Sequence, residues 1–501
     1  MSSISFNQIP TNLRVPFVYV EFDSTQAWQG PGLFPYRHLV IGQSIAAGTQ
    51  DELVPVRVTS AEEAKDLFGA GSQLARMLER HFQNNGWTET WAVAIADADA
   101  ANAAAGTMTF GGPASAAGTI SIYVAGRRVR VAVASGDAAA AIATAVAAAI
   151  NAEADCPVTA AVNGEEDTQV DITAKNKGVS GNDLELRLNY FRGDALPAGV
   201  TVAFDPETGT TGRPTPPDEM AAATAAVASY HGNIDPARPF QTLPLVGCLP
   251  AKAGDAGMRL AGGTANPDID EVFAELGDVH YHVITVPWSD AANLVALNTE
   301  LADRWGPFRM IEGNAIVAAH GTQGELGTLG DSVDSKHITI VNTGGPFTRA
   351  ESNLLLYDGI STVYDDDGGT VRVQRLVTTY KTNGAGAADI AYLDLNTPLT
   401  LGYLRADFRN YILTKYPRAK LKDDGIRAPG QALITPKIGK AEAIARARTW
   451  EELGLVENVD AFAEQVICER NAQDPNRLDW MLPPDLVNQF RIGAAQIRFI
   501  L

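Results

Sequence analysis

The sequence predicts a multidomain α/β protein: a central α/β sheet domain with an inserted β-rich domain, followed by an α+β C-terminal domain with strand-forming terminal arms. Two patterns support this class. Short apolar runs alternate with helical patterns in two separate stretches, as in a mainly parallel sheet flanked by helices. Between these stretches, short β-patterned runs are divided by Gly and Asn turns. The length of 501 residues and the apolar content of 46% allow several packed cores.

The first 25 residues alternate between polar and apolar side chains, which predicts an extended N-terminal arm over residues 1–25. Pro10 and Pro16 each remove a backbone donor, so this strand suits a sheet edge. The apolar side chains expected to act in this arm are Ile4, Phe6, Ile9, Val15 and Phe17.

The first part of the central domain is expected over residues 26–104, with strands at 38–41 and 91–96. Between them, Ser60 and Glu63 fit a capping box that opens a helix. A second helix follows, in which the apolar residues Leu74, Met77, Leu78 and Phe82 repeat at helical spacing.

The inserted β-rich domain is expected over residues 105–212. One long Ala-rich helix at 138–152 interrupts its strands, and Asp137 is the expected N-cap. The Gly- and Pro-rich segment 210–217 is the expected return linker. Strands are predicted at 107–110, 119–124, 129–133, 158–162, 170–174, 184–188 and 200–204.

The second part of the central domain is expected over residues 213–370, with a helix at 290–305. The glycines between Gly321 and Gly330 recur every third residue and match neither GxGxxG nor a P-loop, so a mobile loop is predicted there. Asp-Gly near residue 367 signals a hairpin turn. Buried strands are predicted at 243–247, 283–286, 315–319 and 338–341.

The C-terminal domain is expected over residues 371–489, with a strand at 371–379 and helices near 399–415 and 441–453. A C-terminal strand arm is then predicted over 490–501. Its apolar side chains, including Ile497, Phe499 and Leu501, alternate with Gln496 and Arg498. A terminus that ends as a half-apolar strand suits pairing with a sheet edge, either its own or that of a neighbouring subunit.

Charge is unevenly distributed along the chain. The net charge of −20 argues against a general nucleic-acid binder. Residues 401–450 nevertheless contain eleven Lys or Arg against four acids, which gives +7 there and −27 elsewhere. This window is either an ordinary solvated helical face or a patch for an acidic partner.

We find no pattern that predicts an active site or a metal site. Cys156, Cys248 and Cys468 form no CxxC, and we expect them to be buried. His280 and His282 would share one face of a strand, and packing is favoured over a metal site. No GxSxG occurs, and the triad-type residues are Asp331, His337 and Ser361, whose spacing does not place them together. No apolar run is long enough to cross a bilayer and no secretory signal is visible, so we expect synthesis in a cytoplasm.

Several short segments, spread over nearly the whole chain, together carry a family resemblance. They are Ile4–Pro10, Arg14–Phe22, Ile122–Gly126, Lys175–Gly178, Gly181–Asp183, Arg375–Tyr380, Tyr392–Thr397, Asn471–Trp480 and Leu482–Gln489. In this order, the segments resemble those of the tail sheath proteins of Mu-type contractile phages. No single motif decides the resemblance, but the order of the motifs does, and the last two segments are the most specific.

The resemblance implies a homo-oligomer of stacked hexameric rings around a tail tube, with baseplate and tail terminator proteins as further partners. It implies terminal arms that add strands to a neighbour's sheet, an outward-facing β-rich domain and a tube-facing C-terminal domain. The central domain would be subtilisin-like in fold without protease activity, cofactor or metal. Such a subunit acts in the virion tail after assembly in the host cytoplasm, without direct nucleic-acid contact or membrane insertion. Under this interpretation, the expected tube-facing residues are Lys415, Arg418, Lys420 and Lys422.

The resemblance also implies a mechanism in which subunits assemble in an extended, metastable state and then contract to drive the tube through the host envelope, without nucleotide. Three alternatives stay open at this point. One is the sheath of a related contractile injector or bacteriocin, and another is a hydrolase in the central domain. The third is a surface adhesin of β modules, against which the missing signal peptide and the α/β core both argue.

Overall fold

The computed structural model describes residues 36–190, 193–206, 217–230, 257–343, 347–365, 371–425 and 431–500. All of these lie in one unit of the chain, Tyr36–Leu501. Several predicted features fall outside the described residues: the N-terminal arm with Ile4, Phe6, Ile9, Val15 and Phe17, the strand at 243–247, Cys248 and Leu501.

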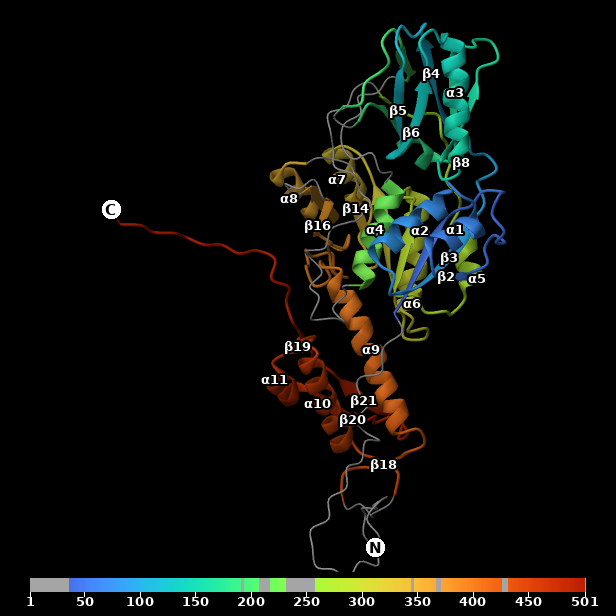
Figure 1. Ribbon diagram of the computed structural model, residues 1–501. Helices are drawn as coiled ribbons and strands as arrows, with labels where there is room; N and C mark the ends of the chain where they lie inside the picture. The colour runs from blue at the N-terminus through green and yellow to red at the C-terminus, as the bar shows by residue number, and fades with distance from the viewer. Residues whose placement is uncertain are drawn as a thin grey trace, which may run out of the picture. The chain divides into compact units, whose positions relative to one another are not determined.

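An eight-stranded sheet forms the centre of the α/β domain (Figure 1). Its strand order is β16-β15-β14-β13-β12-β1-β3-β2, and only the two edge strands β2 and β16 run antiparallel to their neighbours. The mainly parallel sheet confirms the predicted α/β class. The strands are β1 (Arg37–Gln43), β2 (Val56–Val58), β3 (Glu89–Ile95), β12 (Val283–Val286), β13 (Asn314–Ala319), β14 (Ile338–Asn342), β15 (Ile360–Asp365) and β16 (Val371–Arg375).

Helices cover both faces of this sheet because successive strand residues point to opposite sides. Leu39 and Ile41 of β1 pack with α5 (Asp270–Leu276), α6 (Ala291–Trp305), α7 (Gln323–Asp331) and α8 (Arg349–Tyr357). Val40 between them packs on the other face with α1 (Ala61–Phe68), α2 (Gln73–Asn84) and α4 (Pro217–Tyr230). The near-continuous apolar runs of the sequence therefore reflect strands buried on both sides.

Local signals place several helix starts as predicted. The Ser60 hydroxyl accepts from the Glu63 amide at 3.2 Å, and the Glu63 carboxylate reaches back to the Thr59 amide at 2.8 Å. Asp290 caps α6 by accepting from the Asn293 amide. The prediction for Asp137 is wrong: Ala138 is the N-cap of α3, and the Asp137 carboxylate accepts from the Ala134 amide in the preceding turn.

The β-rich domain consists of two four-stranded antiparallel sheets and α3 (Ala139–Ala152) around a separate apolar core. All the strands predicted for it are present, with small shifts at their ends. The strands of the first sheet are β4 (Ala103–Gly111), β7 (Val158–Val162), β8 (Gln169–Lys177) and β10 (Thr201–Asp205). Those of the second are β5 (Gly118–Val124), β6 (Arg127–Val133), β9 (Glu185–Leu188) and β11 (Gly257–Arg259).

The structure differs from the predicted domain boundary at residue 212. The predicted boundary leaves β11 in the central domain, yet β11 pairs with β9, and Met258 is buried in the core of the β-rich domain. The chain passes through α4 of the central domain before it returns to this sheet. A strand of three residues carries too little periodicity to be placed from sequence.

Two further predictions are wrong. The mobile loop predicted between Gly321 and Gly330 is the helix α7, which a capping box of Thr322 and Glu325 opens. His280 and His282 lie just before β12 instead of within a strand, although their rings do lie on one side and stack at 4.0 Å.

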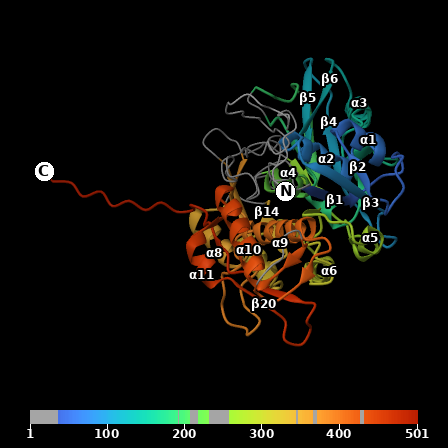
Figure 2. The same cartoon turned by 90° about the horizontal axis from the view of Figure 1, so that it is seen from below.

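The C-terminal domain is α+β, and its helices group together when seen from below (Figure 2). The strand predicted at 371–379 ends earlier, at Arg375. No helix in the described ranges combines the length and the apolar content needed to cross a membrane. The elements are α9 (Asn396–Lys415), β17 (Lys420–Leu421), β18 (Leu433–Ile434), α10 (Pro436–Glu452), β19 (Val456–Glu457), α11 (Val459–Gln465), β20 (Ile467–Arg470), β21 (Leu478–Met481) and β22 (Asp485–Leu486).

Candidate functional site

The C-terminal arm is an extended segment with exposed apolar side chains. After β22, residues 487–500 form no regular secondary structure, and they leave the domain as an extended trace (Figure 1). Ile497 is 89% exposed and Phe499 is 79% exposed. Burying such side chains is favourable by roughly 1.5–3 kcal/mol each. The arm therefore has the composition of a strand that gains stability when another surface covers it.

The hairpin of β20 and β21 is a two-stranded sheet, whose strands are paired only with each other in the described part of the chain. Ile467 and Met481 form a cross-strand pair at its end and are about half exposed, at 48% and 52%. The hairpin packs against α10, where the Trp480 indole Nε1 donates a hydrogen bond of 3.2 Å to the Gly439 carbonyl. Cys468 is half-buried there, whereas Cys156 is fully buried as predicted.

The four basic residues predicted to face a partner are not equivalent. Lys415 forms an ion pair with Glu442 at 2.6 Å, and this contact raises the pKa of Lys415 above its ordinary value. Arg418, Lys420 and Lys422 are exposed around the turn into β17. Among the other basic residues of the 401–450 window, Arg405 is paired with Glu312 and Arg446 with Asp407. Glu442 and Asp407 are already counted in the +7 of the window, so only the pair of Arg405 with Glu312 offsets part of that surplus.

The structure does not bring the triad-type residues together. The Asp331 carboxylate pairs with Lys381 at 2.8 Å. The Ser361 hydroxyl is buried and bonds to the backbone of Val377, as donor and as acceptor. Burial lowers the pKa of His337 to about 4, and its ring packs on Trp305. Each residue has a structural partner, so they form no catalytic unit.

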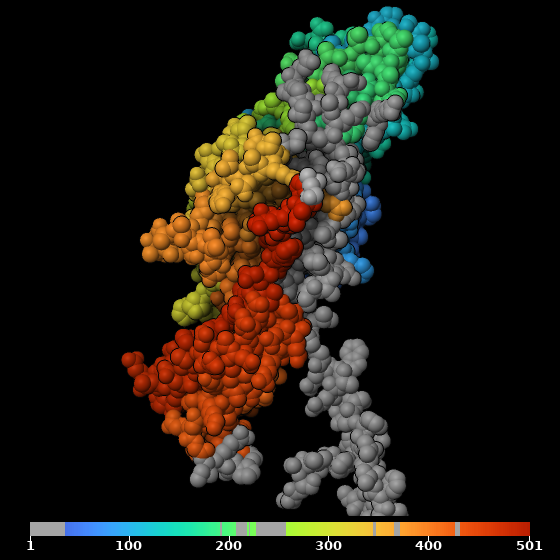
Figure 3. Space-filling view, turned by 90° about the vertical axis from the view of Figure 1, so that its left-hand side faces the viewer, coloured from blue at the N-terminus to red at the C-terminus, as the bar shows by residue number. Residues whose placement is uncertain are grey.

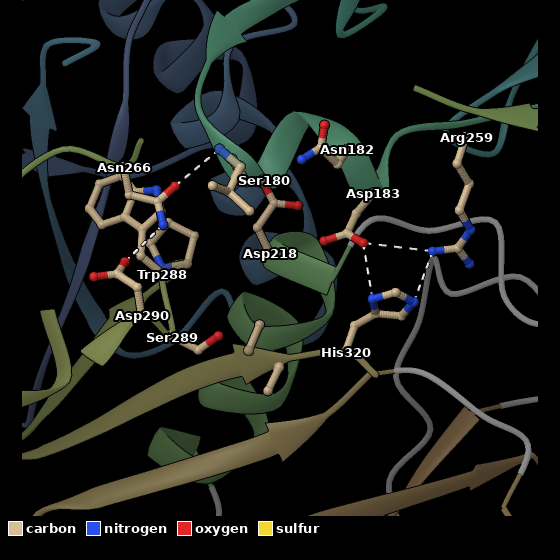
Figure 4. A pocket seen from close by; sticks show the side chains of 14 residues that line it. Ser180, Asn182, Asp183, Asp218, Arg259, Asn266, Trp288, Ser289, Asp290 and His320 are labelled. Atoms are coloured by element: carbon tan, nitrogen blue, oxygen red, sulfur yellow. Dashed lines mark hydrogen bonds and ion pairs between the residues drawn. The ribbon is translucent and has the colours of Figure 1, made fainter. Parts of the chain in front are cut away.

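A cavity of about 500 Å³ opens at the carboxyl ends of β12 and β13, beside the short 3₁₀ helix Val179–Asp183 (Figure 4). His320 lies at one side of it, 3.1 Å from Asp183 and 3.0 Å from Arg259. Because an arginine can only donate, the His320 Nε2 must accept from Arg259, and Nδ1 then donates to Asp183. Both ring nitrogens are therefore engaged. Burial raises the pKa of Asp183 and raises that of Asp218 to about 6.

Sequence reasoning did not find this cavity. Its lining comes from six separate stretches of the chain and follows no motif. In the described ranges no group of His, Cys, Asp and Glu is arranged to hold a metal ion.

The two histidines weighed as a metal site form hydrogen bonds with the backbone. His280 donates to the Glu312 carbonyl, and His282 accepts from the Arg37 amide.

Comparison of the chain with known proteins shows the family to which it is similar. Residues 262–346 match the phage tail sheath protein central domain, and residues 387–500 match the phage tail sheath C-terminal domain. The Mu-like prophage FluMu tail sheath protein of Haemophilus influenzae is 32% identical over 542 residues, which covers 100% of both chains.

Solved sheath tail proteins of Desulfitobacterium hafniense and Listeria innocua are similar at 12% and 11% identity, with TM-scores of 0.41 and 0.43. They align with 94% and 91% of this chain and with 100% and 93% of their own. On the full-length identity, the chain belongs to the phage tail sheath protein family and is a structural component of a phage-like contractile tail.

Proposed function

We propose that this subunit polymerises into stacked hexameric rings around a tail tube and contracts to drive that tube through a host envelope. Baseplate and tail terminator proteins would bound the polymer, which assembles in the host cytoplasm and acts in the virion tail. The full-length relation to a prophage sheath protein and the exposed apolar arm support this proposal. Each subunit would contribute a downhill step from a metastable state, so contraction needs no nucleotide.

The exposed C-terminal arm is the single observation that carries the proposal. Ile497 and Phe499 lie two residues apart, so in a strand both side chains point to the same face. The hairpin β20–β21 is a suitable acceptor, because strand addition at a sheet edge satisfies backbone donors and acceptors of both chains. A second copy of the subunit would thus supply the edge, and the N-terminal arm would act in the same way.

The proposal is tested by imaging the full-length chain beside a variant that lacks residues 1–22 and 490–501. We expect hollow striated tubes or rings from the full chain in negative-stain electron microscopy, and monomers from the trimmed chain. The double variant Ile497→Asp, Phe499→Asp should also stay monomeric, since it charges the apolar face of the arm. Gln496→Asp is the matched control on the opposite face and should assemble. Monodisperse monomers from the full chain at all salt concentrations would refute the proposal.

We further propose that Arg418, Lys420 and Lys422, together with Lys415, face the tail tube. The three exposed side chains and the surplus of positive charge in this window support it. A contact between exposed charges can be broken without a large desolvation cost. This suits a subunit surface that must dissociate from the tail tube when the sheath contracts. Lys415 contributes less, since Glu442 already neutralises it.

We also propose that the subunit has no enzymatic activity. The cavity in Figure 4 is the site at which a hydrolase would be sought, since it lies at the carboxyl ends of parallel strands. The hydrogen bonds of His320 to Asp183 and Arg259 occupy both of its ring nitrogens. This histidine therefore lacks the free nitrogen that would activate a serine hydroxyl.

A further inference from the structure

One partly buried arginine interrupts the exposed end of the C-terminal arm. Phe490 is 84% exposed and Ile492 is 81% exposed, yet the side chain of Arg491 between them is only 11% exposed. All described residues beyond it, 492–500, are exposed. The side of the molecule from which this arm leaves faces the viewer in Figure 3, with the arm in red.

Arg491 contacts the segment that leads into α9. Its Nη2 donates to the Asn396 Oδ1 at 2.9 Å and lies 3.3 Å from the Asp394 Oδ1. The same Asp394 carboxylate receives two hydrogen bonds of 3.0 Å from Arg375 at the end of β16. Two guanidinium groups therefore share one carboxylate, and loss of that carboxylate would leave two partly buried positive charges uncompensated.

This contact is a second attachment of the arm to its own subunit. The first is the β-pairing of β22 with β19, after which the Val487 amide donates to the Leu455 carbonyl at 3.2 Å. Between Val487 and Arg491 the chain passes from the β19 end of the C-terminal domain to the start of α9. The exposed part of the arm therefore begins at Ile492, directly after this second attachment.

We propose that Arg491 is a positioning residue that sets the reach of the C-terminal arm towards a second copy of this chain. With the contact made, the exposed residues 492–500 span at most about 30 Å as a strand. Without it, the unattached segment begins earlier in the chain, and each residue released adds about 3.3 Å to its reach. The anchor thereby fixes both the exit point and the length of the link between subunits. The role towards a second copy rests on the proposed sheath function, whereas the contact itself does not.

Trypsin tests the contact directly, because it cleaves after arginine and the arm holds one partly buried arginine, Arg491, and one exposed arginine, Arg498. In the native full-length chain, we expect cleavage after Arg498 to be at least about tenfold faster than after Arg491, since local opening must precede the second cut. In Asp394→Asn, cleavage after Arg491 should rise to the rate seen after Arg498. Asp460→Asn, an exposed carboxylate on α11, is the matched control and should leave both rates unchanged.

A second variant covers the case in which Asp394→Asn unfolds. Arg491→Lys leaves the Arg375–Asp394 pair intact and keeps a trypsin site. A single ammonium group does not reproduce the planar guanidinium contact with Asn396 and Asp394, so cleavage after position 491 should rise several-fold. Equal cleavage after Arg491 and Arg498 in the wild-type chain overturns the anchor and leaves the sheath function standing.

Cryo-electron microscopy of assembled tubes tests the role in reach. Arg491→Ala should give tubes with a broader distribution of axial repeat than the wild type, because the free segment is longer. An unchanged repeat, with protection of Arg491 confirmed in the wild type, overturns the role in reach. If the wild-type chain never polymerises, the proposed sheath function and the role towards a second copy both fall, while the protease result still decides whether the anchor exists.

Discussion

At the scale of single residues, four buried side chains form a hydrogen-bonded row, and the donor and acceptor of each hydrogen bond in it can be assigned. The Thr285 hydroxyl lies 2.7 Å from His38 Nε2, the two histidine Nδ1 atoms are 3.1 Å apart, and His81 Nε2 lies 2.7 Å from the Thr90 hydroxyl. Thr90 donates its proton to the Thr88 carbonyl, so it accepts from His81. His81 then accepts from His38, and His38 accepts from Thr285. Both histidines must be neutral for this order to exist.

Because both histidines are neutral in the folded protein, we expect the protein to lose stability in acid. Burial lowers the pKa of His81 to about 3, and burial together with His81 lowers the pKa of His38 well below its ordinary value. An unfolded chain therefore binds protons that the folded chain does not, and the free energy of unfolding falls as pH drops below about 6.5. The loss is about 1 kcal/mol per histidine at one pH unit below that value. His280, His282 and His337 contribute with the same sign.

His81→Gln separates this pair from the other histidines. The variant should have a lower apparent Tm than the wild type at neutral pH, because the His38 Nδ1–H then bonds to a poorer acceptor. Its Tm should fall less between neutral pH and about pH 5.5 than that of the wild type, since one proton fewer is linked to unfolding. Thermal melting followed by circular dichroism measures both. Parallel pH curves for the two proteins would contradict the role of the pair.

At the scale of elements, the packing of the β20–β21 hairpin against α10 depends on one glycine of that helix, Gly439. A Cβ atom at Gly439 would lie 2.6 Å from the Cys468 Sγ and 3.1 Å from the Trp480 Nε1. Gly439→Ala should therefore push the hairpin away from α10 and lower stability by about 1–3 kcal/mol, despite the better helix propensity of alanine. Gly384→Ala, where nothing lies within 4 Å, is the control. Melting temperatures compare the two, and an unchanged Tm for Gly439→Ala would show that the hairpin is not held at this point.

The elements also show what sequence could and could not predict. The bounds of β7 and β12 are as predicted, because one buried face gives β7 an alternating pattern and two buried faces give β12 a short continuous apolar run. α7 was missed since Gly327 and Gly330 suggested a loop. These glycines instead allow close approach to Asp358, whose carbonyl would lie 2.1 Å from a Cβ at Gly330. The capping box at Thr322 was a usable signal.

Pairings between distant segments were not predictable in this way. The contact of Arg491 with Asp394 and Asn396 joins residues about a hundred positions apart, and the pairing of Lys415 with Glu442 depends on how two helices meet. Composition showed that the C-terminal window is basic. Only the structure shows that Arg405, Lys415 and Arg446 form ion pairs and that Arg418, Lys420 and Lys422 are exposed.

At the scale of the whole molecule, charge acts in opposite directions on the two proposed contacts. The subunit carries a net charge of −20, so copies repel each other, whereas the basic window would attract an acidic tube. Salt screens both interactions over a Debye length of about 10 Å at 0.1 M. Rising ionic strength should therefore strengthen polymerisation of the subunit alone and weaken its binding to isolated tail tubes.

Charge reversal distinguishes the tube contact from general screening. In the triple variant Arg418→Glu, Lys420→Glu, Lys422→Glu, binding to tubes should fall and its salt dependence should vanish or reverse, since like charges would then face each other. Polymerisation alone, measured by light scattering, should keep its salt dependence. Arg130→Glu, an exposed cation of β6 in the β-rich domain, is the control and should bind tubes like the wild type in co-sedimentation. Unchanged tube binding by the triple variant would show that another surface contacts the tube. The proposal that the arms link the subunits would not be affected.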